Sequence, residues 1–237
     1  PTGAFYGKIT RTVLASSWLA RRGRFDDAAW YRASLRVREI FEQSGSRFQV
    51  EGTAHLAGLN GPAVIIGNHM STAETFLLGA ILLPFRPVTF VVKQSLVEYP
   101  VFKHIMRSRD PVVVGRVDPR ADLKAVLDGG KDRLSRGLSL VIFPQRTRKV
   151  TFDRSAFNTI GVKVAKRNAV PVVPLALKTN AWSNGSWFKD YGPFRPEEAV
   201  RFAFGPPMQV DGNDREVHES VADFIETHLR QWGVPVA

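Results

Sequence analysis

The sequence predicts an α/β fold, with a largely parallel central sheet flanked by helices and a basic two-helix appendage at the N-terminus. From residue 63 onward, short β-branched runs alternate with segments of helical length and period. This alternation is typical of strand–helix units, in which the strands are parallel and both faces of the sheet are buried. The 237 residues suffice for one good core and give no sign of two. We therefore expect a helical segment over residues 1–50 and one α/β domain over residues 51–237.

The N-terminal appendage is expected to contain two basic amphipathic helices. Apolar residues recur at helical spacing within residues 1–24, and cationic residues lie between them. The apolar set is Ile9, Val13, Leu14, Trp18 and Leu19, and the cationic set is Lys8, Arg11, Arg21, Arg22 and Arg24. Asp26 or Asp27 can cap a second helix that stops near Gly45. These helices can pack on the core, or they can place Trp and aliphatic side chains in the headgroup region of an anionic membrane, and both can hold.

The expected elements of the α/β domain follow in a regular order. Strands are expected at residues 63–67, 88–92, 112–114, 139–143 and 170–177, and helices at 74–83, 118–134, 157–167 and 214–232. The last helix has one apolar face, which predicts that it covers the sheet. A late strand is expected over 202–204, at an edge of the sheet. Pro171 and Pro174 limit pairing, so we expect their strand to enter or leave the sheet beside a pocket wall.

The composition limits the class of partner and the chemistry. The net charge of +11 indicates a polyanionic partner, which could be nucleic acid, anionic lipid or a phosphorylated substrate. No apolar run approaches the roughly 20 residues needed to span a bilayer, so any membrane contact is expected to be peripheral. The absence of cysteine excludes disulfides and thiolate metal ligands, and the five histidines show no metal-ligand spacing.

The first candidate site follows the strand at 63–67. That run ends before Asn68 and His69, so a buried strand is expected to deliver an imidazole to a sheet edge. The stretch Ser71-Thr72-Ala73-Glu74 then fits a capping box at a helix start. Alternatively, Glu74 accepts a hydrogen bond from one imidazole nitrogen and leaves the other as a base. This pairing requires His69 to precede the helix, because residues five apart on one helix point about 140° apart.

Two later strand ends carry arginines. Gly115 and Arg116 follow the strand at 112–114, and Pro144-Gln145-Arg146-Thr147-Arg148 follows the strand at 139–143. An arginine at a strand end can bind a phosphate with its two-pronged guanidinium, and a glycine lets a ligand approach the backbone. In a chain this basic, a solvated arginine is the alternative interpretation. Two arginines beside a threonine hydroxyl indicate an anion site.

Together these segments resemble the four ordered motifs of the glycerophospholipid acyltransferases, and most of all the bacterial 1-acylglycerol-3-phosphate acyltransferases. The resemblance covers roughly residues 60–210. It rests on Asn68-His69 with Glu74, on Gly115-Arg116, on Phe143-Pro144-Gln145-Arg146-Thr147-Arg148, and on Val170-Pro171-Val172-Val173-Pro174. It implies that a fatty acyl group passes from acyl-CoA or acyl carrier protein, as co-substrate, to the hydroxyl of lysophosphatidic acid. It implies no cofactor and no metal.

The resemblance also implies roles for individual residues. His69 would be the general base on the acceptor hydroxyl, and Glu74 its carboxylate partner. The implied substrate-binding residues are Asn68, Lys93, Gly115, Arg116, Gln145, Arg146, Thr147 and Arg148, with Arg116 and the segment 145–148 on the acceptor phosphate. The chain departs from the family pattern where Glu74 replaces the usual aspartate and where Gln145-Arg146 replaces Glu-Gly. The second departure affects which acceptor is expected. Arg146 either adds a contact to the acceptor phosphate or points to solvent.

The expected mechanism is direct attack, because the chain offers neither a cysteine nor a Gly-x-Ser-x-Gly elbow to carry the acyl group. Backbone amides near the helix start after His69 are expected to stabilise the oxyanion. The alternatives are another lysolipid or amino-lipid acceptor, or a non-catalytic basic protein that binds lipid surfaces. Nucleic acid is not expected, since the arginines lie at strand ends and not along one helix. We expect a peripheral protein on the cytoplasmic face of the membrane, with residues 1–50 contacting anionic lipid.

Overall fold

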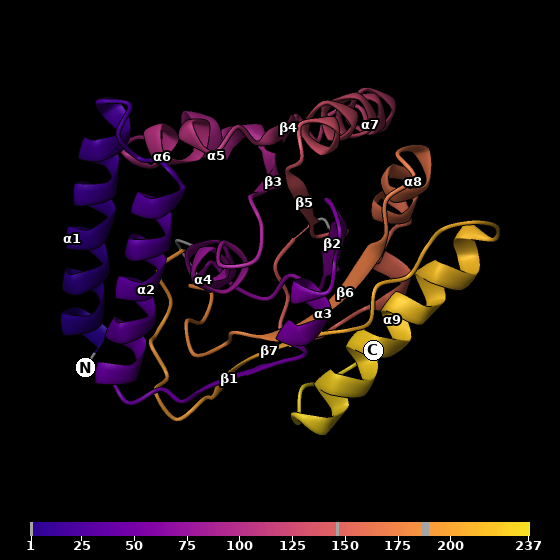
Figure 1. The fold of residues 1–237 in the computed structure, drawn as a ribbon. Coiled ribbons are helices and arrows are strands. Elements are labelled where there is room, and N and C mark those ends of the chain that lie inside the picture. The colour runs from indigo at the N-terminus through magenta and orange to yellow at the C-terminus, as the bar shows by residue number, and fades with distance from the viewer. Residues whose placement is uncertain (1, 146, 186–189) are drawn as a thin grey trace.

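The structure is a computed structural model that describes residues 2–145, 147–185 and 190–237. Within these ranges seven strands form one sheet in the order β1-β7-β6-β2-β5-β3-β4 (Figure 1). They are β1 (Phe48–Glu51), β2 (Val64–Gly67), β3 (Val88–Lys93), β4 (Val112–Val114), β5 (Ser139–Ile142), β6 (Val172–Lys178) and β7 (Val200–Phe204). Neighbouring strands are parallel except β6 and β7, which are antiparallel. The predicted α/β class with a largely parallel sheet is confirmed.

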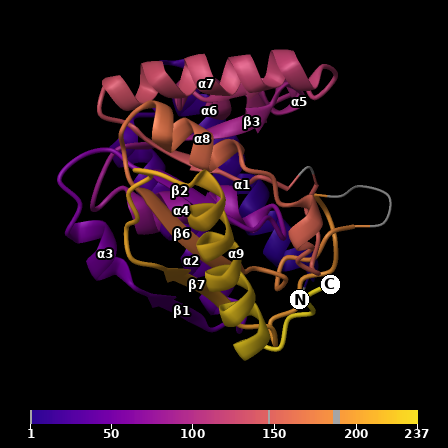
Figure 2. The same cartoon turned by 90° about the vertical axis from the view of Figure 1, so that its right-hand side faces the viewer.

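Helices flank the sheet on both faces. They are α1 (Thr2–Arg21), α2 (Asp27–Gln43), α3 (Thr53–Ala57), α4 (Ala73–Leu82), α5 (Gln94–Glu98), α6 (Phe102–Ser108), α7 (Pro119–Ser135), the short 3₁₀ helix η1 (Arg154–Ala156), α8 (Ile160–Arg167) and α9 (Asp214–Gln231). One face carries α7, α8 and α9, and the other carries α4 with α2 packed against it (Figure 1). As predicted, α9 covers the sheet, where it packs on β6 (Figure 2).

The strand predicted over 202–204 lies inside the sheet, so its expected edge position is wrong. It belongs to β7, which pairs with β1 on one side and with β6 on the other. The edge position belongs to β1, which the sequence pattern does not predict. Three of its four residues are exposed, so it lacks the apolar run that reveals the other strands. Helices α3, α5 and α6 also escape prediction because each spans about two turns or fewer.

Strand β6 contains Pro174 and nevertheless lies in the middle of the sheet, with all seven residues buried. Pro174 therefore does not mark an entry to the sheet or an exit from it. Pairing with β7 begins at Leu175, and the carbonyl oxygen of Pro174 accepts a hydrogen bond from Gly205 N–H at 2.9 Å. The N–H that proline lacks thus falls where the antiparallel ladder ends, which explains why the sheet tolerates it.

Parallel pairing brings the carboxyl ends of β2, β5, β3 and β4 to one edge of the sheet. The first predicted site residue at each carboxyl end is Asn68 for β2, Gln145 for β5, Lys93 for β3 and Gly115 for β4. The fold therefore gathers at one edge residues that are far apart in the sequence.

The N-terminal helices pack onto the α/β core. Phe5 and Ile9 of α1 are buried in the same apolar cluster as the sheet. Leu14 and Trp18 of the same helix remain 53% and 50% exposed. Core packing and an exposed apolar surface thus coexist on α1, and the division of the chain at residue 50 stays a prediction. In the described parts of the chain, no helix has the length and apolar character needed to cross a bilayer.

Gly79 sets how closely α2 approaches α4. A Cβ atom at this position would lie 2.4 Å from Ser34 Oγ and 2.7 Å from Trp30 Nε1. We expect Gly79→Leu to separate the two helices and to cost about 1–3 kcal/mol of unfolding free energy, as overpacking does. Thermal unfolding measures this loss. Gly7→Ala on α1 is the control, since its Cβ would meet nothing within 4 Å, and an unchanged Tm for Gly79→Leu would contradict the close packing.

Candidate active site

The side chain of Asn68 fixes the course of the chain as it leaves β2. Its Nδ2 donates to Leu177 O at 2.9 Å, and its Oδ1 accepts from Leu177 N at 2.9 Å. A buried side-chain amide thus continues the pairing with β6 after the backbone ladder has ended at Gly67. These two hydrogen bonds direct the chain at the next residue, His69, away from the sheet. The implied contact of Asn68 with substrate stays a prediction.

The segment after β5 holds the backbone and ring of His69. Gln145 Oε1 accepts from His69 N at 2.8 Å, and Lys149 N donates to His69 O at 3.0 Å. The imidazole stacks on Phe143, with 4.7 Å between ring centroids and 8° between ring planes. A glutamate at position 145 could accept the same bond from His69 N. The departure from the family pattern at Gln145 therefore preserves this contact.

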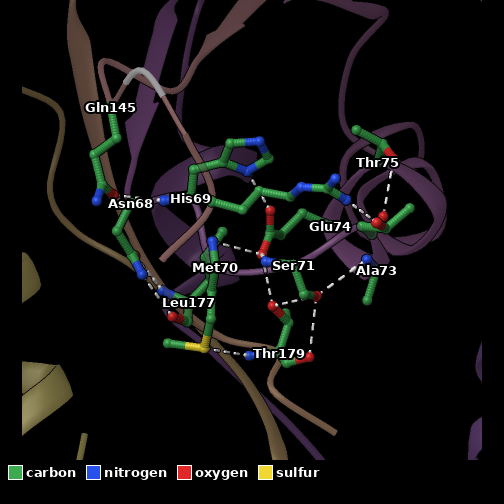
Figure 3. A network of polar contacts seen from close by, with 12 residues as sticks. Asn68, His69, Met70, Ser71, Ala73, Glu74, Thr75, Gln145, Leu177 and Thr179 are labelled. Carbon is green, nitrogen blue, oxygen red and sulfur yellow. Dashed lines mark hydrogen bonds and ion pairs between the residues drawn. The ribbon is translucent and has the colours of Figure 1, made fainter. Parts of the chain in front are cut away.

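Glu74 uses its two carboxylate oxygens for different purposes. Oε2 lies 2.6 Å from His69 Nδ1. Oε1 accepts from Met70 N at 3.0 Å, from Ser71 N at 2.6 Å and from Thr179 Oγ1 at 2.6 Å (Figure 3). The two interpretations of Glu74 therefore hold together, because one oxygen reaches back as a cap while the other faces the imidazole. This is feasible because α4 begins after His69.

The contact with Glu74 determines which imidazole nitrogen carries the proton. An ionised carboxylate only accepts hydrogen bonds, so Nδ1–H of His69 must donate to it. The neutral ring then leaves Nε2 unprotonated, as a base requires. Glu74 is fully buried, whereas the His69 side chain is 19% exposed. In Figure 3 the far edge of the ring points away from the polar network. The arrangement can accept a proton from a group that approaches this edge.

Several backbone amides near the helix start are already bonded within the protein. Besides the three amides that face Gln145 and Glu74, Ala73 N donates to Ser71 Oγ at 3.1 Å. The occupied amides are those of His69, Met70, Ser71 and Ala73. The expectation that amides of this helix start stabilise an oxyanion is therefore wrong for these four.

Arg148 lies beside the start of α4 and has an acidic partner. Its Nη1 donates to Asp190 Oδ1 at 2.7 Å and also contacts Thr72 Oγ1. Thr72 Oγ1 in turn donates to Asp190 Oδ1 at 2.9 Å. The Arg148 side chain is 17% exposed. The predicted anion-binding arginine thus reaches the histidine site through Thr72, and its guanidinium is paired with a carboxylate that no sequence motif indicates.

The other implied cations lie farther along the same sheet edge. Lys93 ends β3, and Arg116 follows β4, which is three strand spacings, or about 14 Å, from β2. Arg116 has a left-handed backbone (φ 61°), and Asp122 Oδ1 accepts from the N–H groups of Gly115 and Arg116 at 2.9 and 3.1 Å. The strand order thus places the backbones of Lys93 and Arg116 two and three strand spacings from β2, and their contact with substrate stays a prediction.

The structure gives less information on the other substrate-binding residues that the resemblance implies. A Cβ at Gly115 would meet no protein atom closer than 3.9 Å, so packing within the protein does not require glycine there, and the approach of a ligand to this backbone stays a prediction. Thr147 is exposed, and Arg146 lies outside the described residues. Thr179 and Asp190 give no signal in the sequence, because each reaches the site from a segment more than 100 residues beyond His69 and neither belongs to a recognisable motif.

The fold and the site together define an α/β protein with a carboxylate-supported histidine at the carboxyl ends of its parallel strands. The family model described as "Acyltransferase" matches residues 47–178. This is more than half of the chain, and the chain belongs to the acyltransferase family. The recognition made from the sequence motifs is confirmed.

Named relatives agree with this membership. The 1-acyl-sn-glycerol-3-phosphate acyltransferase of Pseudomonas aeruginosa is 28% identical over 192 residues, which cover 81% of this chain and 70% of that protein. The enzyme of the same name from Cocos nucifera is 25% identical over 177 residues, covering 75% of this chain and 55% of that protein. The chain thus spans little more than half the length of the plant relative.

A solved structure shares the fold. It is the crystal structure of the 1-acyl-sn-glycerophosphate (LPA) acyltransferase, PlsC, from Thermotoga maritima. The TM-score is 0.71, and the match covers 97% of this chain and 93% of that chain. At 18% sequence identity this likeness bears on the fold alone.

Proposed function

We propose that the protein transfers a fatty acyl group from acyl-CoA or acyl carrier protein to the free hydroxyl of 1-acylglycerol-3-phosphate, giving phosphatidic acid. The observation that carries this proposal is the contact between His69 Nδ1 and the buried carboxylate of Glu74 at 2.6 Å, in a chain of the acyltransferase family. The names of the bacterial and plant relatives support this acceptor.

In the proposed mechanism His69 Nε2 takes the proton of the acceptor hydroxyl while the oxygen attacks the thioester carbonyl carbon. A C–O bond forms, the C–S bond breaks, and the imidazolium returns its proton to the leaving thiolate. General-base assistance of this kind contributes typically about 10²–10⁴-fold in rate. Glu74 keeps the ring in the correct tautomer and stabilises the imidazolium. The chain has no cysteine to carry the acyl group as an intermediate.

We assign the acceptor phosphate to Arg148. In lysophosphatidic acid the reacting hydroxyl and the phosphate are carried by neighbouring carbons, so the phosphate must lie close to the base. Arg148 meets this requirement, because it contacts Thr72 at the start of the helix that carries Glu74. Lys93 and Arg116 remain proposed substrate-binding residues at the far part of the same edge.

We also propose peripheral binding to an anionic membrane surface through α1 and α2. Trp18 is half exposed, and Arg22 stacks on its ring at 3.8 Å. A groove of about 360 Å³ lies between the two helices, and its basic lining residues are Lys8, Arg11, Arg32 and Arg36. Exposed apolar side chains among cations match the chemistry of a lipid headgroup region.

The function is tested by incubating the purified protein with several acyl-CoAs and lysophosphatidic acid and identifying the lipid product by mass spectrometry. We expect phosphatidic acid from the wild type and none from His69→Ala, with the fold retained in the variant. Product from another lysolipid but not from lysophosphatidic acid would show that this other lysolipid is the acceptor. Near-normal turnover by His69→Ala would refute the mechanism.

Glu74→Gln provides the control for the paired roles of this carboxylate. A glutamine has one oxygen and one NH₂ group, so it cannot accept from both the backbone amides and Nδ1–H. We expect kcat to fall by a factor on the order of 10³–10⁴, as for a base held in the wrong tautomer, and Tm to fall as well. A lowered Tm with full activity would leave Glu74 with the capping role alone.

The phosphate assignment predicts opposite effects for the two partners of one ion pair. Arg148→Ala should raise the KM of lysophosphatidic acid roughly 10- to 150-fold, as expected for loss of a charge-assisted bond, and leave the KM of the donor unchanged. Asp190→Asn should lower the acceptor KM, because the carboxylate 2.7 Å from the guanidinium competes with phosphate. Arg230→Ala on α9, 66% exposed, is the control. An unchanged acceptor KM in Arg148→Ala would move the phosphate site elsewhere.

Membrane binding is best tested with point variants, since deleting α1 would remove the buried Phe5 and Ile9 from the core. Leu14→Ser combined with Trp18→Ser should reduce sedimentation with anionic vesicles while the Tm is retained. Phe85→Ser, at a residue 38% exposed, is the control. Equal vesicle binding by the double variant and the wild type would exclude this face of α1 as the contact.

A further inference from the structure

Among the described residues, one hydrogen bond to Glu74 comes from outside its own segment. The donors Met70 N, Ser71 N and His69 Nδ1 all lie within five residues of it. Thr179 Oγ1 lies 105 residues farther along the chain and donates to Oε1 at 2.6 Å. This hydroxyl is therefore the tertiary contact that ties the carboxylate to the central strand β6.

Thr179 is itself held rigidly. Its N–H donates to Met70 Sδ at 3.3 Å, and Ser71 Oγ lies 3.1 Å from its carbonyl oxygen and 2.9 Å from its hydroxyl oxygen. Asn68 clips Leu177, two residues before Thr179, by two further bonds. Several hydrogen bonds thus join the end of β6 to the segment 68–71, so the Thr179 hydroxyl has little freedom to move away from Glu74.

The Thr179 hydroxyl lies in a chain of hydrogen bonds that ends on the carboxylate of Glu74. The carbonyl oxygen and hydroxyl of Thr179 face Ser71 Oγ, which can donate to either, and the Thr179 O–H then donates to Glu74 Oε1. Thr179 and Glu74 are 0% exposed and Ser71 is 1% exposed, so bulk water does not replace a missing donor there. A donor on Oε1 fixes the rotation of the carboxylate about its last bond, and that rotation decides whether Oε2 faces His69.

We propose that Thr179 is a positioning residue for the reaction: its hydroxyl holds Glu74 in the orientation that keeps His69 in its basic tautomer. The inference rests on the proposed function of His69. Thr179 acts through Glu74 and touches no reacting atom. The requirement is greater for a glutamate than for the aspartate of the family pattern, because the longer side chain has one more rotatable bond to fix.

Three substitutions separate this role from a purely structural one. Thr179→Val keeps the shape and removes the hydroxyl, and Thr179→Ser restores it. Thr89→Val is the matched control, because Thr89 is equally buried and its hydroxyl donates to Arg109 O at 2.6 Å, near the amino end of β3 and away from the site. Both valine variants remove one buried hydroxyl with its two hydrogen-bonding contacts, so both should lower the Tm, while only Thr179→Val should affect the reaction.

The kinetic readout is the separate effect on kcat and on the KM values of acyl-CoA and lysophosphatidic acid. For Thr179→Val we expect kcat to fall roughly 10- to 100-fold, the scale of a misplaced catalytic group, with both KM values little changed. A role in structure alone would not produce this selective loss of kcat. Thr179→Ser and Thr89→Val should keep the wild-type kinetic profile.

A spectroscopic readout makes the result independent of activity. The proton between His69 Nδ1 and Glu74 should give a low-field ¹H NMR signal in the wild type that is missing in His69→Ala. We expect Thr179→Val to shift or broaden this signal and Thr89→Val to leave it unchanged. If His69→Ala is inactive but Thr179→Val keeps the wild-type rate, profile and signal, the inference about Thr179 is wrong. If His69→Ala remains active, the proposed function itself fails.

Discussion

The buried carboxylate of Glu74 is the constraint on which the site depends. Burying an ionised carboxylate without donors costs several kcal/mol or more, so the surrounding chain must supply hydrogen bonds. It does so with two backbone amides at the start of α4, one imidazole N–H and one threonine hydroxyl. The donors come from two structural units: the segment 69–71, which joins β2 to α4, and the end of β6. Satisfying one anion therefore fixes these two units and the first turn of α4, which carries Glu74, relative to one another, and the orientation of His69 is a consequence.

The same constraint connects the fold to the proposed chemistry. Strand β2 is central and parallel to both of its neighbours, so its carboxyl end has rigid support on either side. Strand β6 supplies the backbone partner of Asn68 and is followed directly by Thr179. The segment after the other neighbour, β5, supplies Gln145 and Phe143. His69 is thus held by both neighbouring strands while the edge of its ring remains open. Placing a base on a short loop between such supports combines precise orientation with access for a substrate.

The sequence predicts those parts of the molecule whose signal is local. Continuous β-branched runs indicate β2, β3, β4 and β5, and the Asn68-His69 and Glu74 spacing indicates the site. The order of the strands depends on long-range pairing, so the inner position of β7 and the four-residue edge strand β1 have no such signal. The choice between the two interpretations of Glu74 could not be made from sequence either, because it needs the positions of two oxygens. Thr179 and Asp190 are ordinary polar residues until the fold places them beside Glu74 and Arg148.

The distribution of charge distinguishes two proposed functions that the net charge alone does not: attraction to an anionic surface and recognition at the site. At the site each described carboxylate has a side-chain partner, Glu74 with His69 and Asp190 with Arg148. Residues 1–50 hold nine Lys and Arg against four Asp and Glu, so 9 − 4 = +5 of the total +11. Attraction to a surface by such exposed charges acts over about one Debye length and weakens with salt. The proposed recognition of phosphate at Arg148 would depend instead on short hydrogen bonds in a largely buried position, where screening is weaker. The excess charge of the chain therefore supports the proposed contact with an anionic surface, and the proposed chemistry at His69 depends on local geometry.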